Sequence, residues 1–153
     1  MKNYIFLIVI CISLISCNSR QKSNSDIFYI RNQSDFDQYS GNVFPKGSKI
    51  LFSEGTEFKG QFVIKGSGTG DNPNLVSSYN PKNKQILNHW TDKKAIINGQ
   101  GKVEAPIFIR NGQHWEINNL EITNTNGSDD DQGKLKGIYV VAENSGIMEN
   151  ITN

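Results

Sequence analysis

Two copies of one dipeptide, His89-Trp90 and His114-Trp115, offer the side chains best suited to bind or process a sugar. An exposed indole ring can stack on a sugar ring, and an imidazole can transfer protons near neutral pH. Trp115 begins a stretch in which Ile117 shares its face, which predicts core packing for Trp115. Trp90 lies in a polar stretch and is the candidate for carbohydrate binding. The sequence places no acid or nucleophile beside either histidine, so we assign no catalytic residue.

Three consecutive acids, Asp129-Asp130-Asp131, could supply oxygen ligands to Ca²⁺. Calcium takes six to eight oxygen ligands. In an extended chain, however, neighbouring side chains point to opposite sides, so three acids in a row cannot converge on one ion. We therefore predict a solvated loop that the nearby Lys134 and Lys136 neutralise, and no metal site.

A glycine-rich run from Gly66 to Gly70 is similar in composition to a phosphate-binding loop. Such a loop needs a Lys-Ser/Thr pair and a following helix. Asn72-Pro73 follows instead, and Gly and Asn-Pro mark turns by themselves. We predict a turn.

Both cysteines, Cys11 and Cys17, lie near the N-terminus. Lys2 precedes an apolar run that ends at Ile15, and a polar stretch follows, which is the pattern of a secretory signal. The run is shorter than the roughly 20 residues that span a bilayer as a helix, which disfavours the alternative of a permanent membrane anchor. At its end, Leu14-Ile15-Ser16-Cys17 resembles the lipobox of bacterial lipoproteins.

The lipobox resemblance implies that residues 1–16 are cleaved and that Cys17 gains a lipid thioether and an acylated amine. Two or more acyl chains anchor a protein stably at a membrane. We therefore expect a lipid-anchored protein of the bacterial cell envelope, at the outer membrane, facing either the periplasm or the outside. Residues 17–25 are polar and would form a flexible tether. No thiol would remain for a disulfide.

The charge of the chain disfavours a nucleic acid as partner. Lys and Arg number 16, against 15 Asp and Glu, so removal of Lys2 with the signal leaves a formal charge of zero. A nucleic-acid surface needs clustered positive charge. The length beyond Cys17 fits one modest domain.

Short β-strands dominate the expected structure of residues 26–153, because brief apolar runs alternate with Gly, Asn, Asp and Pro. One short helix, Ser34–Tyr39, with Ser34 as its N-cap, is expected to cover the N-terminal end. The predicted strands are Asp26–Arg31, Lys49–Phe52, Gln61–Ile64, Leu75–Tyr79, Ala95–Ile97, Ile107–Ile109, Trp115–Ile117, Leu120–Ile122 and Ile138–Val141.

Side-chain alternation assigns faces to the last two of these strands. The residues predicted to face inward are Leu120, Ile122, Ile138 and Val140, with Glu121 and Tyr139 on the other face. Asparagines at the corners are predicted to bond backbone groups. These are Asn98, Asn118, Asn119 and Asn124.

An internal repeat links several segments. Pro106–Ile109 aligns with Gly137–Val140 at a spacing of 31 residues (107 to 138), and the same spacing carries Asn119-Leu120 onto Asn150-Ile151. The polar insertion Thr125–Gly133 would lengthen the second unit. Short strands, Asn and Gly corners and a repeat of this length fit a β-solenoid better than a hairpin-rich sandwich.

Four segments carry a further resemblance: Pro45–Phe52, Ala95–Gly99, Trp115–Asn124 and Lys136–Val140. They are similar to the N-terminal part of right-handed parallel β-helix proteins of the pectate-lyase-like superfamily. The resemblance implies an all-β, right-handed parallel β-helix (a solenoid) with a short N-terminal helical cap. It also implies a polysaccharide partner, often with lyase or hydrolase activity. A uronate lyase pairs a Lys or Arg base with Ca²⁺. Those groups belong to later coils, so no catalytic or metal-binding residue is carried over.

Three functions stay open: a polysaccharide-degrading enzyme, a non-catalytic glycan-binding or envelope-surface lipoprotein, and an inactive truncated fragment. A solenoid buries its core between neighbouring coils and needs a cap at each end. The sequence from Gly146 to Asn153 only leads into another strand. We therefore expect the chain to be incomplete and to continue with further coils.

Overall fold

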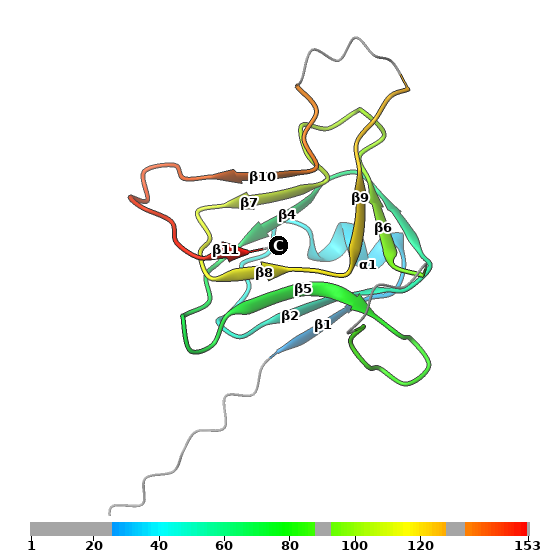
Figure 1. The fold of residues 1–153 in the computed structure, drawn as a ribbon, viewed down its shortest axis with the longest axis horizontal. Coiled ribbons are helices and arrows are strands. Elements are labelled where there is room, and N and C mark those ends of the chain that lie inside the picture. Colours follow the sequence, from blue (N-terminus) through cyan, green and yellow to red (C-terminus); the bar gives the residue numbers. More distant parts are fainter. Residues whose placement is uncertain (1–25, 88–92, 128–133, 153) are drawn as a thin grey trace, which may run out of the picture.

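The computed structural model describes residues 26–87, 93–127 and 134–152. These residues form short strands and one helix (Figure 1). In chain order the elements are β1 (Ile27–Ile30), α1 (Gln33–Tyr39), β2 (Lys49–Ser53), β3 (Glu57–Lys59), β4 (Phe62–Lys65), β5 (Asn74–Tyr79), β6 (Ala95–Asn98), β7 (Ile107–Arg110), β8 (Trp115–Ile117), β9 (Leu120–Thr123), β10 (Ile138–Val141) and β11 (Ile151–Thr152).

The strands belong to three separate sheets, in the orders β1-β2-β5-β8-β11, β10-β7-β4 and β3-β6-β9. Every pairing between named strands is parallel. Two parallel neighbouring strands need a long connection. Helix α1 lies in the connection from β1 to β2, and from β2 onward each connection between paired strands includes a strand of both other sheets. The predicted all-β class is confirmed in this form: parallel sheets with little helix.

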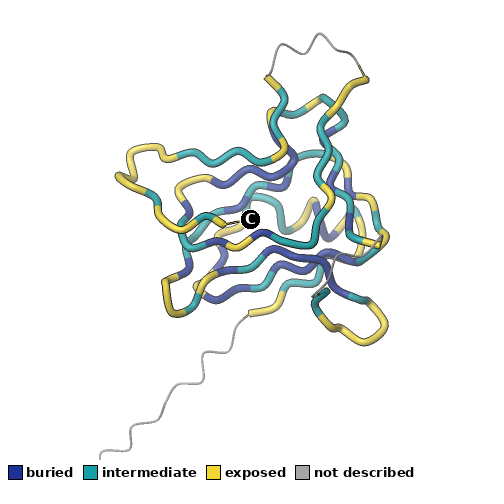
Figure 2. The backbone as a smooth tube through the Cα atoms, in the orientation of Figure 1, coloured by how far each residue is buried: buried dark blue, intermediate teal, exposed yellow. Residues whose placement is uncertain are grey.

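The three sheets surround one apolar interior, with α1 behind it (Figure 1). Phe36 of α1 is 2% exposed and packs against Phe52, Phe58 and Phe62, at ring-centroid distances of 6.2, 5.8 and 5.1 Å. Buried residues follow the strands, whereas exposed residues gather in the loops that join them (Figure 2). The predicted role of this helix, covering the N-terminal end of the core, agrees with the position of Phe36.

The predicted N-cap of the helix is wrong. Helix α1 begins at Gln33, and Asn32 is its N-cap, because the Asn32 side chain accepts a hydrogen bond from the Asp35 N–H at 3.0 Å. Ser and Asn are comparable N-caps, so composition did not distinguish Asn32 from Ser34. The predicted strand at Gln61 begins one residue later, at Phe62.

The repeat prediction is half right. Ile138 pairs with Ile107, and Val140 with Ile109, at the predicted spacing of 31 residues. The predicted stacking of Ile151 on Leu120 is wrong, because Ile151 pairs with Trp115. The inward assignment of Leu120, Ile122, Ile138 and Val140 is confirmed, since all four pack against the buried core.

Candidate functional site

The outward face of the β10-β7-β4 sheet carries a set of side chains that we call the cationic–aromatic face. It consists of Val63, Lys65, Phe108, Arg110 and Tyr139, with Glu104 and Lys136 where the strands begin. Side chains alternate along a strand. Because Phe62, Ile64, Ile107 and Ile109 are fully buried inside, their neighbours point outward.

Strand register arranges this face in two rows. Val63, Phe108 and Tyr139 are register partners across the three strands and form an apolar row. Lys65 and Arg110 are partners in the next outward row. Neighbouring strands lie about 4.8 Å apart, so the two cations are adjacent.

A groove of about 590 Å³ runs along this face. One wall is the segment that follows α1, where Gly41 N–H bonds the Val63 carbonyl at 2.8 Å. The Ser40 hydroxyl donates to the Gln61 carbonyl and accepts from Val63 N–H, both at 3.0 Å. The other wall is the Val103-Glu104 segment before β7. The volume lies within the range of small-molecule sites.

Aromatic rings and cations contact one another along the face. The Phe108 and Tyr139 rings are edge-to-face, with centroids 5.4 Å apart. The Arg110 Cζ lies 5.5 Å from the Phe108 centroid, and the Lys136 Nζ lies 4.4 Å from the Tyr139 centroid. Both distances fall within the range of cation–π attraction.

Two ion pairs border the face. Arg110 Nη1 lies 3.6 Å from Glu143 Oε2, and Lys136 Nζ lies 3.0 Å from Glu104 Oε1. Lys65 has no ion-pair partner among the residues that the structure describes. The face therefore keeps a positive balance of three cations against two carboxylates, and partly exposed pairs of this kind contribute little to stability.

The two carboxylates lie at different ends of the sheet. Glu104 precedes β7 and Glu143 follows β10, and each is paired with its own cation.

Trp115 of the second His-Trp dipeptide lies in the core, as predicted, whereas His114 is partly exposed. Trp115 is 1% exposed, and its Nε1 donates to the Gly66 carbonyl at 2.9 Å. His114 Nδ1 lies 3.1 Å from the Asn150 amide nitrogen. The partner of this histidine is thus an amide rather than an acid or a nucleophile.

Three other predicted residues or motifs lie outside the described residues: Cys17, Trp90 and Asp129-Asp130-Asp131. Within the described ranges, no group of three or more His, Cys, Asp or Glu could hold a metal ion. The glycine run at Gly66–Gly70 forms the predicted turn, with Thr69 and Asn72 bonding each other's backbone.

The corner asparagines behave largely as predicted. Asn98 accepts from Gln100 N–H, Asn119 donates to the Leu87 carbonyl, and Asn124 binds four backbone groups. Asn118 differs, because it donates to the Glu116 side chain at 2.6 Å.

The sequence alone did not identify the residues of the cationic–aromatic face as one site. Lys65 and Arg110 each come directly after a predicted strand, and each is the last residue of the observed strand. Only the strand register makes them neighbours. The repeat that aligned Phe108 with Tyr139 was the one available signal.

No helix among the described residues is long and apolar enough to cross a membrane. Comparisons of the chain with protein-family models, with curated proteins and with solved structures found no match.

Proposed function

We propose that this chain is an exported lipoprotein that binds an acidic polysaccharide through its cationic–aromatic face. In this proposal the three sheets are the faces of a right-handed parallel β-helix, and the lipid on Cys17 holds the domain at the cell envelope. The repeated parallel, in-register pairing in each sheet supports the β-helix. The lipobox-like sequence supports the anchor.

The observation that carries the proposal is the pair of adjacent rows on the cationic–aromatic face. Tyr139, which is half-buried, offers apolar ring surface for the C–H face of a sugar ring. Phe108 is 8% exposed, with Arg110 over its ring, and it lines the groove beside this row. Lys65 and Arg110 lie in the neighbouring row, where a carboxylate or sulfate on the same sugar would be within reach. A guanidinium matches the two oxygens of such a group. A neutral glycan would leave these cations without a new partner.

A binding assay tests this function directly. Mature lipidated protein in detergent micelles is titrated calorimetrically with polygalacturonate, as the acidic glycan, and with dextran, as the neutral one. We expect binding of polygalacturonate that weakens with salt and no measurable binding of dextran. The double variant Lys65→Ala/Arg110→Ala should weaken binding about tenfold or more, which corresponds to about 1.4 kcal/mol.

Matched controls distinguish binding at the cationic–aromatic face from nonspecific electrostatic attraction. Lys59 lies on β3 in another sheet and is exposed, so Lys59→Ala should leave affinity unchanged. Tyr139→Ala should weaken binding without changing its salt dependence. Equal binding of both glycans, or equal effects of the Lys59 and Lys65/Arg110 variants, would refute the proposal. Release of unsaturated or reducing ends during the titration would select the enzymatic alternative.

A further inference from the structure

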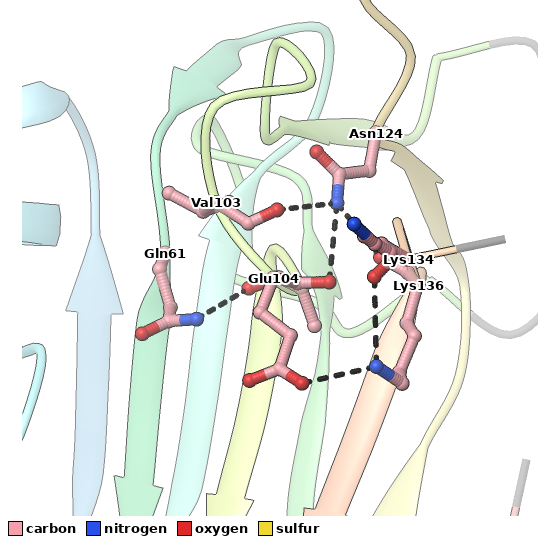
Figure 3. Close-up of polar contacts among 7 residues, drawn as sticks. Gln61, Val103, Glu104, Asn124, Lys134 and Lys136 are labelled. Atoms are coloured by element: carbon pink, nitrogen blue, oxygen red, sulfur yellow. Dashed lines mark hydrogen bonds and ion pairs between the residues drawn. The ribbon is translucent and has the colours of Figure 1, made fainter. Parts of the chain in front are cut away.

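Asn124, which directly follows β9, connects its own segment with Gly101–Glu104 and with Lys136 (Figure 3). Asn124 Nδ2 donates to the carbonyl oxygens of Val103, Lys136 and Glu104, at 2.8, 3.0 and 3.3 Å. Its Oδ1 accepts from the Gly101 N–H at 3.1 Å. The amide thus uses both its donor and its acceptor groups, and all four partners are backbone atoms.

These partners hold the side chains that border the cationic–aromatic face (Figure 3). Lys136 N–H donates to the Glu104 carbonyl at 2.9 Å, and its Nζ pairs with the Glu104 carboxylate at 3.0 Å. The same ammonium lies 4.4 Å from the centroid of the Tyr139 ring. Gln61 fastens the next residue of this wall, since its Nε2 donates to the Ala105 carbonyl at 2.9 Å.

The wall that Asn124 holds separates two hollows. Val103 and Glu104 line the groove on one side and a second depression of about 380 Å³ on the other. Lys102 and Lys134 also line that depression. A displacement of the wall would therefore change both hollows and move the Lys136 ammonium away from Tyr139.

The position of the Asn124 side chain depends on Gly99 in the preceding passage of the chain. A Cβ atom at residue 99 would lie 2.3 Å from Asn124 Oδ1, which no real contact allows, and 2.9 Å from Val103 Cγ2 in the wall itself. Gly99 does not have a positive φ, so alanine there is disfavoured by these collisions rather than by backbone strain. Gly99→Ala should consequently displace the Asn124 amide while leaving Asn124 in the sequence.

We infer that Asn124 is a positioning residue for ligand binding, which sets the Lys136 ammonium and the Glu104 wall at the edge of the cationic–aromatic face. The inference rests on the proposed binding function for its consequence, and on the four hydrogen bonds for its mechanism. Asparagine is required because aspartate lacks the donor that three carbonyl groups need and alanine lacks both groups.

The first experiment measures position without any glycan. Full-chain protein is treated with an amine-acylating reagent, and mass spectrometry follows the modification rates of Lys136 and Lys59. Asn124→Ala and Gly99→Ala should each raise the Lys136 rate and leave the exposed Lys59 rate unchanged. An unchanged Lys136 rate in either variant, when that variant is folded, would overturn the inference. Because this measurement needs no ligand, it tests whether Asn124 positions Lys136 even if the proposed glycan binding fails.

The second experiment measures the consequence for binding. Asn124→Ala should weaken polygalacturonate binding about two- to fivefold, the size expected for a partly exposed charged contact. If Asn124 acts through Lys136, Asn124→Ala should weaken binding little further in a Lys136→Ala background. An additive loss in this cycle would indicate a general structural role and would refute positioning.

Protein that fails to fold is recognised by its melting curve. If Asn124→Ala does not melt cooperatively, Asn124→Asp keeps the side-chain volume, loses the donor and should show the same rise in Lys136 reactivity. Gly99→Ala serves as the variant in which residue 124 itself is intact. Folded protein with unchanged Lys136 reactivity in either of them would again contradict the inference.

Discussion

The hydroxyl of Ser78 on β5 donates a hydrogen bond to the backbone oxygen of Asn119, 2.5 Å away. The same hydroxyl accepts from the Ala95 N–H at 2.9 Å. Ser78 is fully buried, and its two partners lie at the start of β6 and at the corner between β8 and β9. One small side chain thus satisfies backbone groups from two other passages of the chain.

Ser78→Ala should lower the free energy of unfolding by about 2–4 kcal/mol, because one buried and one partly buried backbone group lose their partner. Ser77 is the matched control. Its hydroxyl is equally buried but has no hydrogen-bond partner among the described residues, so Ser77→Ala should change stability by less than about 0.5 kcal/mol or increase it. Urea unfolding of both variants checks this. Equal losses would show that the Ser78 bonds contribute nothing.

The Arg31–Asp35 pair makes stability depend on pH in the acid range. The guanidinium and the backbone N–H of Arg31 both donate to the Asp35 carboxylate and lower its pKa. A carboxyl group whose folded pKa lies below its unfolded value of about 3.9 stabilises the fold above that pH. This contribution is lost as the pH falls through the folded pKa.

Asp35→Asn should therefore lower the melting temperature at pH 7 by about 2–5 °C. The difference from the wild type should shrink as the pH falls below about 4. Asp37→Asn, an exposed change on the same helix, should have little effect at any pH. A gap between wild type and Asp35→Asn that stays constant from pH 7 to pH 3 would contradict the role of the pair.

Alternation along β9 gives a further prediction for stability. Leu120 packs against the core but is only half-buried, whereas Glu121 is exposed. Leu120→Ala should cost about 2 kcal/mol, the lower end of the range for core leucines. Glu121→Ala should cost less than about 0.5 kcal/mol. Thermal melts that rank the two variants equally would remove the inward assignment of Leu120.

Strands were predictable where apolar residues alternate between turn residues, as in Phe62–Lys65 and Ile138–Val141. Strand β3 was missed because its sequence, Glu57-Phe58-Lys59, contains a single apolar residue. Only the burial of Phe58 inside the core and the pairing with β6 identify it as a strand.

The second half of the repeat failed for a physical reason. Asn119 and Asn150 both adopt a left-handed conformation, with φ of 52° and 55°, immediately before a strand. His114, with φ of 54°, does the same before Trp115. Similar turn chemistry therefore recurs at different corners, and local sequence cannot say which corner is stacked on which. Pairing of Ile151 with Trp115 fixes that choice.

Local patterns predicted the outward position of Tyr139 but not the rest of the cationic–aromatic face. Val63, Phe108 and Tyr139 are brought into one row by strand register across two long connections of unequal length. The ion pair between Glu104 and Lys136 likewise joins residues 32 positions apart. Candidates chosen for residue type, such as His114, proved to have packing or hydrogen-bonding roles instead.

Lipidation of Cys17 is the prediction on which the proposed envelope location depends. Leu14-Ile15-Ser16-Cys17 lies at the end of the apolar run of the predicted signal, and the thioether requires the sulfur of residue 17. Cys17→Ser should thus abolish incorporation of a labelled fatty acid and leave an unlipidated precursor of full length. Cys11→Ser is the matched control, because Cys11 lies within the part to be cleaved, and it should be labelled like the wild type. Fatty-acid label that persists in Cys17→Ser, or is lost in Cys11→Ser alone, would mean that Cys17 is not the anchor.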